Sequence, residues 1–180
     1  MWGITSSAGK RGSFDVTLPT DREIRMTRWF DAAAGDVFDA MTTPARIREW
    51  WCRLDEDYSV PFCETDVRVG GRWRFVSRFP WGEATRYGEY REIVRPRRLV
   101  YTQIFEELPS VISLVTIDLE DDRGRTRMTA TIEYPTLLIR DMILASGASS
   151  VAALSYDRLE QQLAAVNRSA APTSASPAPP

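Results

Sequence analysis

Hydrophobic and polar residues alternate with a period of two along most of the chain between residues 24 and 134. The first alternating stretch places Ile24, Met26, Arg28 and Phe30 on one face of a strand, because successive side chains of a strand point to opposite sides. Turns containing Gly or polar residues separate the later stretches. We therefore predict an antiparallel sheet whose further strands cover residues 62–69, 72–79, 85–94, 99–106, 110–120 and 126–134.

Helical spacing interrupts this pattern after the first strand and again at the end. Val37 and Phe38 belong to a short helix that begins near Gly35 or Asp36, and Thr43 is suited to cap a second helix that has Pro44 at its first position. The pattern over residues 136–166 predicts one long helix. Arg158, Glu160 and Gln161 are expected to face away from its apolar face, which consists of Leu144, Ala148, Val151, Ser155, Leu159 and Leu163.

These elements define a domain over residues 22–167 with a segment at either end. Residues 1–21 form a polar leader, in which the alternating residues 14–18 are suited to add a strand to the edge of the sheet. Residues 168–180 are mostly Ala, Pro and Ser, and such a composition predicts disorder because it cannot bury enough apolar surface to fold.

A Gly-Gly turn joins the strands at 62–69 and 72–79. Trp73 and Phe75 follow it at a spacing of two, so both point to the core face and are candidates for an aromatic wall. Asp66 and Arg68 precede Gly70-Gly71, and we expect them to form a solvent-facing ion pair beside the turn.

Composition excludes several kinds of chemistry. The chain has no histidine and its sole lysine is Lys10, so His-based triads, His-ligated zinc and Schiff-base chemistry in the domain are excluded. We expect no metal and no cofactor. Cys52 and Cys63 are expected to be buried thiols.

Charge and hydropathy also restrict the partners. The net charge is −2, and Arg72, Arg74 and Arg78 lie opposite the Trp73 face, as on an ordinary solvated surface, so no nucleic-acid partner is expected. The chain lacks both an apolar run of about 20 residues and the apolar core of a signal peptide. We expect a cytoplasmic protein without membrane insertion, and homodimer formation stays open.

Several motifs, in this order, resemble one superfamily. They are Val37-Phe38-Asp39-Ala40, residues 44–51, 66–73 and 88–102, Arg140-Asp141, Ser146-Gly147 and Asp157-Arg158-Leu159. Together they resemble the SRPBCC (START-like, helix-grip) superfamily, in the branch named after the activator of heat shock protein 90 ATPase. The resemblance implies an α+β helix-grip fold, in which a curved antiparallel sheet wraps around a long C-terminal helix and two short helices follow the first strand.

The same resemblance implies a cavity between the sheet and the long helix, and three functions follow from it. The first is binding of a small hydrophobic molecule by a carrier, sequestering or resistance protein, or sensor. The second is a polyketide cyclase, aromatase or dehydratase, for which Tyr90, Tyr101 and Glu92 are the catalytic candidates, although Glu92 is also suited to brace a turn. A co-chaperone-like interaction with heat shock protein 90 ranks a distant third, and the family name alone suggests it.

We expect the cavity to be lined by side chains from the core faces of the strands and of the long helix. The candidates are Trp51, Trp73, Phe75, Tyr90, Tyr101, Gln103, Ile117, Met128, Ala148, Val151, Ala152 and Ser155. Relatives often carry Met and a bulky residue where this chain has Ala148 and Ala152. Two interpretations stay open, a wider pocket or compensation by Trp51, Tyr101 or Met128.

Overall fold

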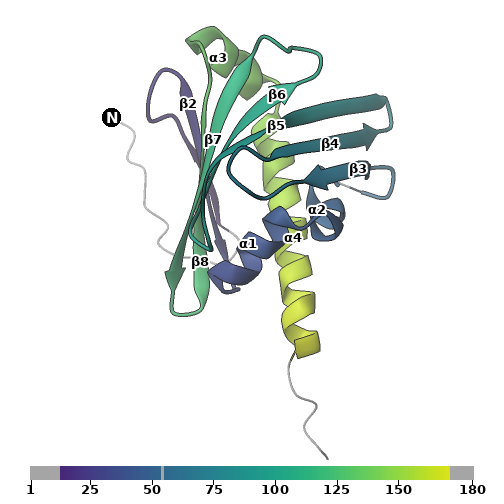
Figure 1. The fold of residues 1–180 in the computed structure, drawn as a ribbon, viewed down its shortest axis with the longest axis vertical. Coiled ribbons are helices and arrows are strands. Elements are labelled where there is room, and N and C mark those ends of the chain that lie inside the picture. Colours follow the sequence, from purple (N-terminus) through teal and green to yellow (C-terminus); the bar gives the residue numbers. More distant parts are fainter. Residues whose placement is uncertain (1–12, 54, 171–180) are drawn as a thin grey trace, which may run out of the picture.

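The strands form one curved, antiparallel sheet that wraps around a helix from the C-terminal part of the chain (Figure 1). The computed structural model describes residues 13–53 and 55–170. Within these residues the sheet has eight strands in the order β1-β2-β8-β7-β6-β5-β4-β3. This is the helix-grip architecture expected from the sequence.

The strand bounds follow the alternation closely. The leader contributes an edge strand, because Phe14 of β1 pairs with Arg28 of β2. The strand expected over residues 62–69 instead begins and ends earlier, and residues 66–71 form a loop. The strands are β1 (Phe14–Thr17), β2 (Glu23–Phe30), β3 (Ser59–Thr65), β4 (Arg72–Phe79), β5 (Gly82–Val94), β6 (Arg98–Phe105), β7 (Ile112–Asp122) and β8 (Arg125–Glu133).

Two short helices, α1 (Ala34–Thr42) and α2 (Pro44–Trp50), connect β2 to β3 as expected. Thr43 occupies the N-cap position of α2, but its side chain makes no capping hydrogen bond. Its carbonyl oxygen accepts from the backbone N–H of Ile47 instead. The expected position of Thr43 at the N-cap is therefore correct, but its side chain does not cap the helix.

The prediction of one continuous C-terminal helix is wrong. The segment forms α3 (Leu137–Ala145) and α4 (Ala148–Ala170), which are bent by 61° at the break between them. Gly147 has φ +80°, a conformation that ends a right-handed helix and that Gly adopts without steric cost. Its carbonyl oxygen then accepts from the N–H groups of Ser150 and Val151, which starts α4.

The two ends of the chain lie partly outside the described residues. Residues 1–12 of the expected leader and residues 171–180 of the expected tail lie outside the described residues. The expected tail began at residue 168, yet α4 continues to Ala170. Disorder was therefore the wrong prediction for residues 168–170.

Among the described helices, none is by itself long and apolar enough to cross a membrane. Only α3 and α4 taken together reach the required length and composition, and they are a bent pair.

The outer face of the sheet is polar, as the alternation predicts. Arg72, Arg74 and Arg78 are exposed on β4. Arg74 pairs with Glu106 and Arg78 pairs with Glu83, at N–O distances of 3.0 and 2.8 Å. This face is a solvated surface with paired charges. Asp66 and Arg68 also form the expected exposed ion pair at 2.8 Å, although both lie in the loop after β3.

The middle of α4 packs against α1, α2 and β2. Leu159 is fully buried and Leu163 is 2% exposed, while Leu154 on another face of the helix is 48% exposed. The apolar face predicted for the long helix is thus correct across its break.

Replacing Leu159 by Ala is expected to lower the free energy of unfolding by about 2 to 5 kcal/mol, because it removes buried methyl groups and leaves a cavity. Leu154→Ala is the matched control, since its side chain is half exposed and its loss should change stability by less than about 0.5 kcal/mol. Guanidinium unfolding measures both. Equal, small effects at the two positions would mean that α4 does not pack as described.

Candidate functional site

A cavity of about 330 Å³ lies between the concave face of the sheet and the bend between α3 and α4. Strands β2 and β4 to β8 form one wall, α3 and α4 form another, and the end of α2 closes one side. Most of the lining side chains are apolar or aromatic. They include Met26, Met41, Trp50, Trp51, Phe79, Trp81, Phe105, Val115, Ile117, Ala130, Ile132, Ile143, Ala148, Val151 and Ala152.

The structure brings most of the residues expected from the sequence to this cavity. From the sheet and α2 come Trp51, Tyr101, Gln103 and Ile117, and from α4 come Ala148, Val151, Ala152 and Ser155. The remaining four candidates and Glu92 lie elsewhere.

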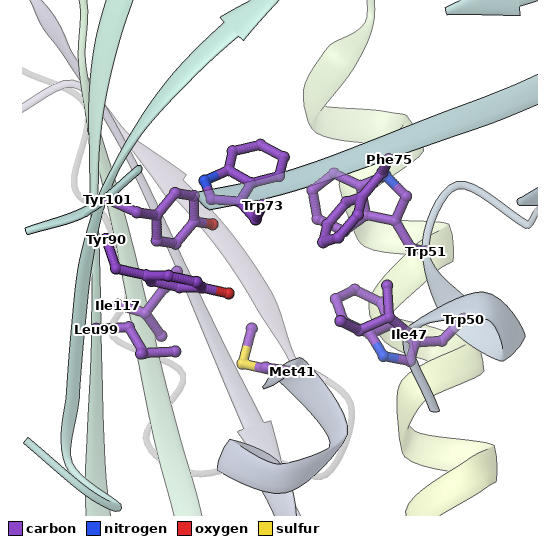
Figure 2. A pocket seen from close by; sticks show the side chains of 10 residues that line it. All are labelled: Met41, Ile47, Trp50, Trp51, Trp73, Phe75, Tyr90, Leu99, Tyr101 and Ile117. Carbon is purple, nitrogen blue, oxygen red and sulfur yellow. The ribbon is translucent and has the colours of Figure 1, made fainter. Parts of the chain in front are cut away.

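Trp73, Phe75 and Tyr90 line a separate inner space of only about 30 Å³, which can hold one or two waters but no organic ligand. Figure 2 shows Tyr90 and Tyr101 reaching from the sheet toward the side where Trp50, at the end of α2, and the following Trp51 lie. The rings pack closely, with centroids 4.9 Å apart for Trp73–Phe75 and 5.4 Å apart for Trp51–Phe75. This aromatic cluster forms the floor of the larger cavity, with which it shares Tyr101 and Trp51.

Two candidates occupy positions from which they cannot reach the cavity. Met128 of β8 is fully buried in the core but does not line either space. Glu92 of β5 is half exposed and pairs with Arg98 at 3.2 Å. A β-bulge between Tyr90 and Glu92 inserts one extra residue opposite β6, which reverses the alternation and turns Glu92 to the outer face.

The bend at Gly147 lies beside the cavity. Ser146 on one side of the bend and Ala148 on the other both contribute to its lining, as does Ala152 one turn later. Trp51 and Tyr101 line the same space but do not fill it. Ala148 and Ala152 thus present small side chains to the cavity, and the choice between a wider pocket and compensation by other side chains stays a prediction.

One candidate polar group is already used in the fold. The hydroxyl of Ser155 accepts a hydrogen bond from the backbone N–H of Cys52 at 3.1 Å and donates to the carbonyl of Val151 at 2.8 Å. Ser155 thus ties the end of α2 to α4. The role of its hydroxyl in the cavity wall is therefore to join two elements of the fold.

Tyrosine hydroxyls supply further polar groups on the lining. Tyr134 and Tyr156 line the cavity together with Tyr101, although the sequence pattern did not single out the first two. Burial raises the pKa of Tyr134 to about 12, and burial raises the pKa of Tyr101 and Tyr156 further. All three hydroxyls are therefore neutral donors at physiological pH.

Sequence reasoning also missed Arg86, a charged residue of β5 in the cavity lining. A signal for it was present, because Arg86 lies four residues before Tyr90 on the same strand and so shares its inward face. Its Nη1 atom lies 3.2 Å from Cys52 Sγ.

Both cysteines are buried free thiols, as expected. Burial raises the pKa of the Cys63 thiol to about 11, with Arg48 partly opposing this effect. Cys63 is therefore a neutral core residue at physiological pH.

A wider hollow of about 790 Å³ lies on the outer face of the sheet, where its lining is rich in charged side chains. Several of these charges pair with one another, as in Arg98–Asp118 at 2.6 Å and Arg127–Glu120 at 3.2 Å. Such a surface suits water, so the candidate site for an apolar molecule is the cavity inside the sheet.

Comparison with known proteins agrees with this architecture. The family model described as activator of Hsp90 ATPase homolog 1-like protein matches residues 31–164. A solved structure from Rhodobacter sphaeroides has a TM-score of 0.78 at 24% identity and covers 86% of this chain and 99% of its own. One from Mycobacterium smegmatis has a TM-score of 0.76 at 20% identity, with 84% and 98% covered.

An AHSA1-like protein from Aeromonas hydrophila has a TM-score of 0.61 at 16% identity and covers 83% of this chain and 98% of its own. At these identities the solved structures show the shared fold alone. No curated protein matches the chain.

Proposed function

We propose that this chain, which belongs to the activator of Hsp90 ATPase homolog 1-like family, binds a small hydrophobic molecule in the cavity between its sheet and α4. The observation that carries the proposal is the cavity itself. Its volume of about 330 Å³ falls within the range of small-molecule sites, roughly 300 to 1,000 Å³. Its mostly apolar lining with a few polar groups is also typical of such sites.

The position of the cavity supports binding. Ala148 and Ala152 contribute only small side chains to its α4 wall, and the packed rings of Trp73 and Phe75 lie next to its floor. A ligand in this space would bury apolar surface against several elements at once, at about 25 cal/mol per Å². The protein would then act as a carrier, a sequestering protein or a sensor.

The enzymatic alternative has less support from this geometry. Its catalytic candidates included Glu92, which lies on the outer face, and Tyr90, which faces only the inner space of about 30 Å³. Tyr101 alone of the three reaches the larger cavity.

Filling the cavity from α4 is expected to abolish binding. Ala152→Trp places a large side chain in the space, so the affinity for the neutral fluorophore N-phenyl-1-naphthylamine should fall at least tenfold, about 1.4 kcal/mol. The melting temperature should be unchanged or raised, because the new ring fills space and leaves no core group displaced. Fluorescence titration and thermal unfolding monitored by circular dichroism measure the two effects.

Leu154→Trp is the matched control for this experiment. It adds the same ring two residues away on an exposed part of the same helix, and should leave probe affinity unchanged within twofold. The proposal would be contradicted by a folded Ala152→Trp variant that binds the probe as well as the wild type does. Failure of the wild type to bind any hydrophobic probe would count against it equally.

A further inference from the structure

Arg86 is the single charged residue among the described side chains that line the cavity. Its guanidinium carbon lies 4.9 Å from the ring centroid of Phe105 and 5.7 Å from that of Trp51. Among the described residues its one hydrogen-bond partner is the Cys52 thiol. A positive charge is thus held against aromatic faces in a mostly apolar space.

Within the described part of the chain, no carboxylate lies at ion-pair distance from Arg86. Two arginines of the neighbouring strand β4 differ from Arg86 in this respect, since Arg74 and Arg78 each form an ion pair with a glutamate. Arg86 is partly buried, and the aromatic faces offset part of the cost of this desolvation. They accept none of its in-plane N–H groups, and a thiol is a weak acceptor. Most of the donors of Arg86 therefore lack a strong acceptor among the residues that the structure describes.

Trp51, the aromatic neighbour of Arg86, carries a second unused donor. Its indole Nε1 is buried and has no hydrogen-bond acceptor among the described residues. Leaving such a group unpaired costs the free energy of its desolvation, so natural structures rarely retain one without a reason. Trp73 shows the ordinary arrangement, because its Nε1 donates to the carbonyl of Thr102 at 3.2 Å.

The other polar groups near this corner are also donors. Tyr101 and Tyr134 both lie close enough for the charge of Arg86 to oppose the rise in their pKa, and both hydroxyls stay protonated. Gln103 adds an amide to the same lining. The cavity thus offers positive charge and N–H or O–H donors, and its described lining includes no carboxylate.

From these observations we propose that the molecule bound here is a hydrophobic carboxylic acid, whose carboxylate lies at Arg86 and the Trp51 indole N–H while its apolar body lies against α4. This inference rests on the proposed function and names the class of ligand. A carboxylate has two oxygens that together accept from both donors, and an arginine binds it more strongly than a neutral group. A neutral hydrocarbon or an amine would leave these donors unpaired.

The test compares 2-naphthoic acid with 2-naphthamide, which have the same ring and nearly the same shape but differ in charge at pH 7.5. Calorimetric titration of the wild type should show at least tenfold tighter binding of the acid. Arg86→Met should reduce this preference to less than threefold, and Trp51→Phe should weaken acid binding several-fold, since it removes the N–H and keeps a ring.

Arg74→Met is the matched control, because it removes an arginine from the outer face of the adjacent strand and should leave the preference intact. Arg86→Gln provides a second variant should the Met variant not fold as judged by circular dichroism. Equal binding of acid and amide to the wild type, or an unchanged preference in folded Arg86 variants, would overturn the inference. Binding of the amide and of N-phenyl-1-naphthylamine would then still support the cavity as a hydrophobic site, whereas binding of none of the three would count against the proposed function itself.

Discussion

Gly88→Ala is expected to destabilise the fold by more than about 4 kcal/mol, a loss that few single substitutions cause. An added Cβ at this position would overlap the carbonyl oxygen of Thr102 and lie 2.8 Å from Trp73 Nε1. The first of these atoms belongs to the backbone of β6, which cannot shift without breaking its pairing with β5.

The need for glycine comes from the side chain of Trp73. Trp73 pairs with Gly88 across β4 and β5, and its indole extends over Gly88 to donate to the carbonyl of Thr102 on β6. The Trp73 ring thus joins β4, β5 and β6. Any side chain at position 88 would keep this ring from reaching Thr102. Loss of this contact would also disturb the aromatic floor of the cavity, because the Trp73 ring packs on Tyr101 at 5.4 Å.

Gly35→Ala is the control. Gly35 lies in α1, and an added Cβ there would meet nothing within 4 Å. This variant should be as stable as the wild type or more stable by about 0.5 to 1 kcal/mol, because Ala favours a helix over Gly. Guanidinium unfolding of both variants checks the prediction. A Gly88→Ala variant within about 1 kcal/mol of Gly35→Ala would show that the strands at Trp73 can separate without loss.

The second large effect is expected at Arg28, whose side chain is 3% exposed beneath α4. It bonds Asp157 at 2.7 Å and Glu160 at 2.5 Å, so it ties β2 to the helix. Removing both carboxylates by Asp157→Ala and Glu160→Ala leaves a buried guanidinium that cannot lose its charge. The free energy of unfolding should therefore fall by about 3 to 5 kcal/mol.

Removing the arginine as well should restore stability. With Arg28→Met added to the two alanine substitutions, at least half of the loss should be regained, because an apolar side chain of similar length suits the buried position. The exposed pair Arg74–Glu106 is the control, and Glu106→Ala should change stability by less than about 1 kcal/mol. If Arg28→Met instead lowers stability further, the cost does not come from an unpaired buried charge.

These two predictions give physical reasons for parts of the motifs by which the family resemblance was recognised. Gly88 belongs to the motif over residues 88–102, and the close approach of Trp73 explains it. Asp157 belongs to the Asp-Arg-Leu motif and pairs with Arg28. Arg140, of the Arg-Asp motif, pairs with Asp141 and donates to the carbonyl of Thr20, which anchors α3 near the start of β2. The motifs therefore mark points where distant elements are joined.

The sequence alone determined the faces of the strands and of α4. Trp73 and Phe75 point inward, Arg72 and Arg74 point outward, and Ala148, Val151 and Ala152 share one side of α4, as the spacing indicated. These features follow from the period of the backbone, two for a strand and 3.6 for a helix, which neighbouring residues establish by themselves. The resemblance added the order in which the elements assemble.

Only the tertiary structure decided which inward side chains meet at the cavity. The helical spacing of apolar residues continues past Ser146 and Gly147, so this periodicity did not predict the break that the positive φ of Gly147 produces. A bulge in β5 turned Glu92 outward, and Glu160, expected to face solvent, reaches the buried Arg28. That Arg86 has no carboxylate partner among the described residues depends on what β4, β6 and α2 place around it. Local periodicity specifies a direction for each side chain, whereas its partners depend on bends and pairings between residues far apart in the chain.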